Sequence, residues 1–461
     1  MKISTRLLTL TLFLNLIFIS SLLFSQELNK TQKTETVNNI AQLLIDNYVF
    51  PELGIKCASH IKEKLMEGKF DNVSDKKEFA NMLTSELQSV SKDKHMRVVI
   101  PRQTTNRAEN SNPYYDQYKL SIETAEDNYR FRKVEMLDGG IGYIDLRGFA
   151  ESDKAFNVAI LAMKFLSNSN AVIFDLRKNG GGSPEMIRFI LSYFFEKPTH
   201  INSIYYREGD QTKEFWTNEK VDGKKMSTVP MFVLTSNYTF SGGEEFSYNI
   251  KTQKRGVLIG EVTGGGANPG GVFPAANGFG IFIPVGRAIN PITNTNWEGV
   301  GVMPDIETSA NTALDKALEL AKIEAEKYKQ KILAAAKADY DALLKDVKDA
   351  EELFTKNSSE AENKIISALN ILLKKNLMDE TGINLLGYRL LGEKKQLIAL
   401  SIFKFNTEKY TNSANAYDSL AEAYLNSGNK ELAIKNYEKS LELNPQNTNA
   451  VEQLKKLNII K

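Results

Sequence analysis

The chain has 461 residues, of which 42% are hydrophobic and 25% charged, so it is a globular protein of two or three domains rather than a disordered chain. Lys plus Arg (58) nearly equals Asp plus Glu (57), which argues against a protein that acts mainly on nucleic acid. The single cysteine, Cys57, excludes an intramolecular disulfide and a cysteine-rich zinc site. The three histidines are His60, His95 and His200, a short list of candidates for acid–base chemistry.

The N-terminal segment predicts export. Lys2 and Arg6 precede an almost wholly apolar run over residues 7–24, and the chain turns polar at Ser25. This order is typical of a cleaved secretory signal over residues 1–25, followed by a periplasmic or extracellular protein with no membrane span. The alternative is a retained N-terminal membrane anchor, because a run of this length is at the lower limit for a spanning helix.

Composition divides the rest of the chain into further regions. Apolar residues at helical spacing, such as Val37, Ile40 and Leu44, predict a small N-terminal helical subdomain over residues 26–110. Residues 311–379 are rich in Ala, Lys, Glu and Leu and predict a helical linker.

Between these regions, over residues 111–310, short apolar strands alternate with helical segments and Gly-rich turns. This alternation predicts an α/β domain with a mixed or parallel sheet. The clearest strands are Ile141–Leu146, Ala171–Leu176, Met231–Leu234, Val257–Gly260 and residues 278–285, and the expected helices between them are Val158–Leu166, Met186–Phe195 and Glu244–Ile250.

Residues 380–461 contain an internal repeat. Glu380–Ser413 and Ala414–Asn447 align as two 34-residue stretches that share Leu, small and aromatic residues at matching positions. The pattern resembles a pair of tetratricopeptide repeats and predicts an all-helical region that binds a protein partner. A generic helical hairpin is the alternative, and two repeats need neighbouring helices or a partner to complete their stack.

Ser241 stands between an apolar strand and a predicted helix, followed by Gly242. At a helix N-terminus the unpaired backbone amides stabilise a developing negative charge, and a glycine lets a substrate approach the backbone, so Ser241 is a candidate nucleophile. The alternative is structural: Ser241 and Glu244 also fit a capping box, in which the serine only caps the helix.

A second glycine stretch, Gly180-Gly-Gly182, follows a predicted buried strand. It matches neither the dinucleotide fingerprint nor the P-loop, so a tight strand-to-helix turn is the simplest interpretation. Beside a nucleophile, however, the amide of Gly181 or Gly182 would supply a second oxyanion donor.

His95 precedes an apolar run that predicts a strand, whereas His60 falls on a polar-faced helix and His200 in a predicted loop. His95 is therefore the best-placed base, although most lone histidines are structural. Glu298 opens a Gly-rich turn that contains a second acid, Asp305; an acid there would orient an imidazole, or be one surface acid among many.

Taken in order, these segments resemble the serine peptidase family that contains the tail-specific (C-terminal processing) proteases, the tricorn protease core and the interphotoreceptor retinoid-binding protein modules. The resemblance spans roughly residues 35–310. It implies a crotonase-like mixed-sheet core of the ClpP/tail-specific protease type. The motifs that carry it are Asp175-Leu-Arg-Lys-Asn-Gly-Gly-Gly182, Thr235-Ser-Asn-Tyr-Thr-Phe-Ser-Gly-Gly-Glu-Glu-Phe246, Gly260-Glu-Val-Thr-Gly-Gly-Gly-Ala267 and Glu298-Gly-Val-Gly-Val-Met-Pro-Asp305.

Two departures from the family pattern define a subgroup. Ser-Lys members carry a lysine in a Thr-x-Gly-Lys-Gly stretch, where this chain has Gly266, so a Ser-Lys dyad is not expected. Only about forty residues separate the His95 motif from the Ile141 strand, too few for an inserted PDZ domain.

The resemblance to tricorn-like members then implies a triad of Ser241, His95 and Glu298, with oxyanion donors from Gly242 and from Gly181 or Gly182. No metal or cofactor is expected. The predicted function is an exported serine endopeptidase acting on peptides or proteins, with repeats that bind a protein. The alternatives are a non-catalytic carrier of a hydrophobic ligand on the same fold, and a repeat-based protein-binding scaffold.

Overall fold

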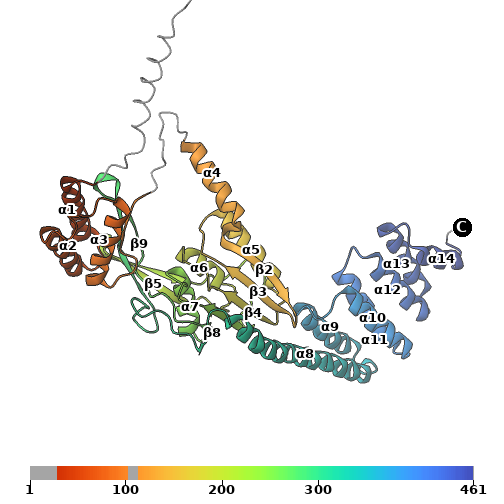
Figure 1. The fold of residues 1–461 in the computed structure, drawn as a ribbon. Coiled ribbons are helices and arrows are strands. Elements are labelled where there is room, and N and C mark those ends of the chain that lie inside the picture. Colours follow the sequence, from red (N-terminus) through yellow and green to blue (C-terminus); the bar gives the residue numbers. More distant parts are fainter. Residues whose placement is uncertain (1–27, 102–112, 460–461) are drawn as a thin grey trace, which may run out of the picture. The chain divides into compact units, whose positions relative to one another are not determined.

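The computed structural model describes residues 28–101 and 113–459, and the predicted signal at residues 1–25 lies outside these ranges. The chain divides into two compact units, Met1–Tyr328 and Lys329–Lys461, whose elements are labelled in Figure 1. In the described ranges, no helix combines the length and the apolar character that crossing a membrane requires.

A six-stranded mixed sheet forms the centre of the first unit, as the sequence predicts. Four neighbouring pairs in it are parallel, and only β2 at one edge runs antiparallel, to β3. The order is β12-β8-β7-β4-β3-β2. The strands are β2 (Phe131–Leu137), β3 (Ile141–Leu146), β4 (Ala171–Asp175), β7 (Met231–Thr235), β8 (Val257–Gly260) and β12 (Ile306–Glu307).

Both faces of this sheet are buried, which explains why its strands are continuous apolar runs rather than alternating ones. In β4, Val172 and Phe174 contribute to the core on one face, with helices α5 (Asp153–Leu166), α6 (Pro184–Leu191) and α7 (Gly242–Thr252). The intervening residues, Ala171 and Ile173, contribute to the core on the other face. There the first turns of α8 (Ala313–Phe354) present alanines at every fourth position, namely Ala313, Ala317, Ala321 and Ala325.

Two smaller sheets complete the first unit. Strand β1 (Arg97–Val99) pairs with β10 (Gly280–Pro284), and β10 pairs with β9 (Gly270–Pro274), so the segment after His95 lies beside a segment almost two hundred residues later in the chain. Helices α1 (Lys30–Asn47), α2 (Pro51–Met66) and α3 (Lys76–Ser91) share a hydrophobic core with β1 and β10.

The third sheet has the order β11-β5-β6, with β5 (His200–Tyr206), β6 (Gln211–Trp216) and β11 (Gly286–Ile289). The remaining elements are α4 (Pro113–Glu126) and the short 3₁₀ turns Asn128–Arg130, Glu208–Asp210 and Ala276–Gly278.

The second unit consists of helices. Its repeat-like helices pair α10 with α11 and α12 with α13, and a Cβ atom on Gly387 would lie 2.6 Å from the Phe403 ring, so the small residue lets α10 and α11 approach closely. Leu343 and Val347 of α8 join the same core, as expected for repeats that need neighbouring helices. The helices are α9 (Ser358–Lys374), α10 (Glu380–Gly392), α11 (Gln396–Lys409), α12 (Ala414–Asn426), α13 (Lys430–Leu443) and α14 (Thr448–Lys456).

The alanine stripe of α8 yields a stability prediction. Ala317 is fully buried against the sheet, so Ala317→Leu should overpack the interface and lower the free energy of unfolding by ~1–3 kcal/mol. Ala334→Leu is the matched control, because Ala334 is exposed on the same helix. Thermal unfolding of the two variants measures the difference, and equal midpoints would contradict the packing account.

Candidate active site

Ser241 has a strained backbone at the start of α7. Its φ of 52° and ψ of −119° are unfavourable for any residue with a side chain, and such conformations cost about 1–3 kcal/mol. The Ser241 amide donates to Glu244 Oε2 (2.8 Å), and its carbonyl accepts from the amides of Glu244 and Glu245 (2.9 Å each). The contact from Glu244 expected of a capping box is therefore present, and a helix-capping serine can still be a nucleophile.

The Glu244 carboxylate joins Ser241 to the loop of residues 263–267. It is fully buried and accepts four hydrogen bonds: from Ser241 N, the Thr263 hydroxyl (2.5 Å), Gly265 N (2.6 Å) and Gly266 N (2.8 Å). Burial raises the pKa of Glu244, and the four donors oppose that rise. In the sequence Glu244 was interpreted only as a capping partner; no local pattern shows which glycine amides it would meet.

Three glycines surround Ser241 closely enough to exclude side chains. A Cβ atom on Gly181 would lie 2.8 Å from the Ser241 Cβ, and one on Gly242 would lie 2.9 Å from the Gly182 amide nitrogen. The Gly181 amide already donates to Asn179 Oδ1 (2.9 Å). The amides of Gly182 and Gly242 donate to no other residue in the described ranges, so these two are the free donors beside Ser241.

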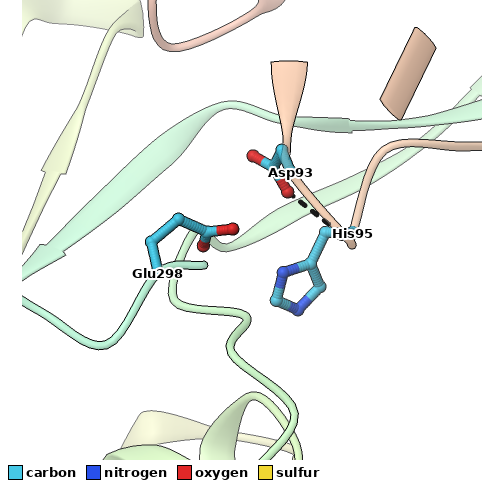
Figure 2. A group of neighbouring side chains, drawn as sticks. All are labelled: Asp93, His95 and Glu298. Carbon is cyan, nitrogen blue, oxygen red and sulfur yellow. Dashed lines mark hydrogen bonds between the residues drawn. The ribbon is translucent and has the colours of Figure 1, made fainter. Parts of the chain in front are cut away.

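His95 and Glu298 lie together, and Asp93 joins them (Figure 2). One potential ligand atom from each of the three side chains lies within 4.8 Å of the others, so they also form the one group of this kind in the described residues that could hold a metal ion. His95 occupies the turn just before β1 and is 5% exposed. Figure 2 shows one ring nitrogen on the side of the Glu298 carboxylate and the other pointing away from both acids.

Two buried atoms of this cluster lack hydrogen-bond partners among the described residues. They are His95 Nδ1 and Glu298 Oε1, a natural donor and acceptor for each other. The other oxygen of Glu298 accepts from the Ala267 amide (2.6 Å), which fixes the carboxylate on the loop of residues 263–267. A small approach of ring and carboxylate would therefore pair both unsatisfied atoms.

Asp93, two residues before His95, is a site residue that no sequence pattern indicates. Its oxygens accept from the Tyr48 hydroxyl (3.2 Å), Asn268 Nδ2 (3.0 Å) and the His95 amide (3.0 Å). Burial raises the pKa of Asp93, and burial together with the Asp93 charge raises the pKa of Glu298 to about 7. Burial and the Arg97 charge lower the pKa of His95 to about 4, so its imidazole is neutral at pH 7.

Gly266, at the position of the family's lysine, has no room for a side chain. A Cβ atom there would lie 2.6 Å from His95 Cε1 and 2.3 Å from Phe240 Cζ. The His95 and Phe240 rings are in contact, with centroids 4.6 Å apart, and Phe240 directly precedes Ser241. His95 thus occupies the space that a longer side chain at position 266 would enter.

The structure thus brings His95 and Glu298 into one cluster and places Ser241 beside it through Phe240, Glu244 and Gly266. Between the Ser241 hydroxyl and His95, two described residues, there is no direct hydrogen bond. The other two histidines are engaged elsewhere: His60 bonds Glu86 (2.8 Å), and His200 stacks on Trp216 (centroids 4.8 Å). The prediction of a loop at His200 was wrong, because His200 begins β5.

Chemically, the arrangement combines a neutral imidazole, a carboxyl group on one side of it, a strained serine and two free amides. Such a set can transfer a proton from a hydroxyl and stabilise an oxyanion.

Family models match most of the first unit. Residues 140–308 match the model of peptidase family S41, and residues 28–131 match that of the N-terminal domain of Peptidase_S41 in eukaryotic IRBP. A tetratricopeptide repeat model matches residues 414–447, the second of the two predicted repeats. The family resemblance predicted from the motifs is therefore confirmed.

Two curated proteases and one solved structure are similar to parts of this chain. Carboxyl-terminal-processing peptidase 1, chloroplastic, from Arabidopsis thaliana is 28% identical over 180 residues, 39% of this chain and 35% of its own length. The tricorn protease of Thermoplasma volcanium is 26% identical over 233 residues, 46% of this chain and 20% of its own length. The solved structure of photosystem II D1 C-terminal processing protease aligns with a TM-score of 0.40 at 14% identity, over 61% of this chain and 94% of that one. This chain thus covers about a third or less of the length of these two curated relatives.

The crowding at Gly266 yields a test of how His95 is positioned. Gly266→Ala should displace the His95 and Phe240 rings and lower the rate at which a fluorophosphonate labels Ser241 by at least about tenfold. Gly271→Ala is the control, since a Cβ atom at Gly271 meets nothing within 4 Å. Labelling is followed by mass spectrometry and folding by circular dichroism; an unchanged rate in Gly266→Ala would show that the position of His95 is irrelevant.

The acid pair yields a pH prediction. Protonation of Glu298 removes the charge facing His95, so the labelling rate should fall as pH decreases through about 7, well above the pKa of His95 at about 4. Asp93→Asn removes the neighbouring charge that raises the pKa of Glu298, so this acid limb should move to lower pH. Asp138→Asn, at an exposed turn, should leave the profile unchanged. If the labelling rate of Asp93→Asn falls at the same pH as that of the unaltered chain, the Asp93 charge does not influence the pKa of Glu298.

Proposed function

We propose that the protein is an exported serine endopeptidase that hydrolyses peptide bonds of peptides or proteins through Ser241, His95 and Glu298. The observation that carries the proposal is the pair of unsatisfied buried atoms, His95 Nδ1 and Glu298 Oε1, next to a strained serine with free amides. A structural histidine or helix-capping serine would need none of these features together. The matches to peptidase family S41 support the same class of reaction.

In the proposed reaction, the second ring nitrogen of His95 takes the Ser241 proton as the hydroxyl oxygen attacks the carbonyl carbon of the scissile bond. Glu298 accepts a hydrogen bond from Nδ1–H, which holds the tautomer and stabilises the imidazolium. The amides of Gly242 and Gly182 donate to the oxyanion. Gly181 was an equal candidate from sequence, and its bond to Asn179 favours Gly182 as the donor.

The imidazolium then gives its proton to the leaving amine as the peptide C–N bond breaks, which leaves an acyl ester on Ser241. Water attacks this ester with His95 again as base, and collapse of the second tetrahedral intermediate releases the acid and restores the serine. The neutral state of His95 at pH 7 suits its role as proton acceptor.

The rest of the chain has its own part in the proposal. Residues 1–25 direct export, residues 26–110 supply the histidine, residues 111–310 form the catalytic core without a PDZ domain, and residues 311–379 lead to the repeats. The repeats at 380–461 bind a protein partner; a repeat model matches residues 414–447 within them.

Variants of the proposed pair test the mechanism. Ser241→Ala and His95→Ala should each lower peptidase turnover by several orders of magnitude, and the double variant should lose little more, because the two act as one unit. The intact chain should react with a fluorophosphonate at Ser241, and both variants should lose this adduct.

Ser227→Ala and His60→Ala serve as controls, since Ser227 bonds Glu196 and His60 bonds Glu86 away from the cluster. Near-additive losses in the double variant, or an adduct at another serine, would refute the triad.

A further inference from the structure

A basic pocket opens near Ser241, separate from the acid cluster. It has a volume of about 560 Å³ and is lined by Arg130, Arg147, Arg177, Lys178 and Tyr238. Four of its five lining residues are cations and none is an acid. The carboxylates of Asp145 and Asp175, which pair with Arg147 and Arg177, line an adjoining pocket of about 280 Å³ that shares Arg177 and Lys178 with this one.

The pocket lies at the edge of the sheet where bound ligands are expected. Strands β3, β4 and β7 are parallel, so their carboxyl ends meet at one edge, and α/β folds bind ligands outside those ends. Arg147 follows β3, the Arg177–Lys178 pair follows β4, and Tyr238 follows β7. Arg130 immediately precedes β2, which runs antiparallel to β3 and therefore begins at the same edge.

The same loops carry the groups proposed to bind the scissile carbonyl. Lys178 is three residues before Gly181, and Tyr238 is three residues before Ser241. A Cβ atom on Gly148 would lie 3.2 Å from the Arg130 Cγ and 3.1 Å from the Gly181 carbonyl oxygen. Arg130 therefore lies next to Gly148, Gly148 lies next to Gly181, and Gly181 contacts Ser241.

Donors remain free in this pocket. Lys178 is exposed and has no ion-pair partner among the described residues. Arg147 uses Nε and one terminal nitrogen for Asp145, which leaves the other terminal nitrogen without a partner in the same ranges. Arg130 pairs with Asp127 (3.0 Å) while its side chain is 57% exposed. In contrast, all three guanidinium nitrogens of Arg177 donate hydrogen bonds, to the Asp175 carboxylate and the Ala310 carbonyl.

The backbone that leads to Arg130 is strained. Asn128, Tyr129 and Arg130 all have positive φ angles (45°, 54° and 75°), a run of left-handed residues without a glycine. Such conformations persist where the surrounding structure imposes them, and they concentrate at ligand-binding sites.

We infer that this pocket binds a carboxylate group of the peptide substrate, through Arg130, Arg147 and Lys178. The inference rests on the proposed function for the identity of the ligand, a peptide that passes Gly181 and Gly182 on its way to Ser241. The carboxylate comes from an acidic side chain or from the free C-terminus of the peptide. Each supplies the planar acceptor that arginine donors fit.

Binding to an inactive chain tests this inference without relying on catalysis. Three short rhodamine-labelled peptides of one neutral sequence are titrated into the full-length Ser241→Ala chain and followed by fluorescence anisotropy. One peptide ends in an amide, the second also ends in an amide but contains a glutamate in place of a glutamine, and the third ends in a free carboxylate. At least one carboxylate peptide should bind about tenfold more tightly than the neutral amide, and salt should weaken this preference.

Pocket variants then locate the preference. Arg130→Gln with Lys178→Gln should reduce the tenfold difference to about one, and Lys178→Gln alone should reduce it in part, since exposed Lys178 is not needed for folding. Lys220→Gln removes the same charge at an exposed site outside the pocket and should keep the preference. Equal binding of all three peptides, or a preference that survives the double variant, would overturn the inference. The peptide that loses affinity identifies the source of the carboxylate.

Fluorophosphonate labelling separates this inference from the proposed function. Labelling of Ser241 is measured on the intact chain, and Lys220→Gln, which lies outside the pocket, should label at the same rate. A labelled serine with no carboxylate preference would remove the pocket alone. A carboxylate preference lost in the double variant, together with an unreactive serine, would remove the peptidase proposal and leave a carboxylate-binding site.

Discussion

The candidate site depends on one buried carboxylate, that of Glu244. Its two oxygens accept from Ser241, Thr263, Gly265 and Gly266, and so join the start of α7 to the loop of residues 263–267. Hydrogen bonds to a charged group stabilise by about 1.5–3 kcal/mol each, enough together to offset the strained Ser241 backbone. The same loop carries Gly266, against which His95 packs, and Ala267, which donates to Glu298. A backbone bond from the Gly264 amide to the Thr239 carbonyl (2.9 Å) joins the same two segments, so Glu244 adds to this link the contact with Ser241 itself.

The space beside Phe240 holds either a side chain at position 266 or the His95 imidazole. A side chain there and the His95 imidazole exclude each other, since a Cβ atom would already lie 2.6 Å from the ring. A side chain longer than glycine at this position would fill the space from the loop side. Here the ring of His95, in the turn just before β1, occupies it instead.

Much of the fold could be predicted from the sequence, because its signals are local. The runs at residues 141–146 and 257–260 match β3 and β8 residue for residue, since parallel strands buried on both faces are continuous apolar segments. The roles of Glu244 and Asp93 could not be predicted, because each depends on partners far along the chain, such as Thr263 and Asn268. The loop predicted at His200 was wrong for the same reason, because pairing with Trp216, sixteen residues later, makes this segment a strand.

The residues beside His95 are acidic, whereas the pocket lined by Arg130, Arg147 and Lys178 is basic. Beside His95, the charge of the buried Asp93 raises the pKa of the half-buried Glu298, so an additional substrate carboxylate there would be repelled. In the cationic pocket, the free donors of Arg130, Arg147 and Lys178 attract one. A peptide with a carboxylate would therefore place its acidic group in this pocket rather than beside Asp93 and Glu298. Beside those two acids, burial weakens screening by salt and makes the repulsion of such a carboxylate strongest.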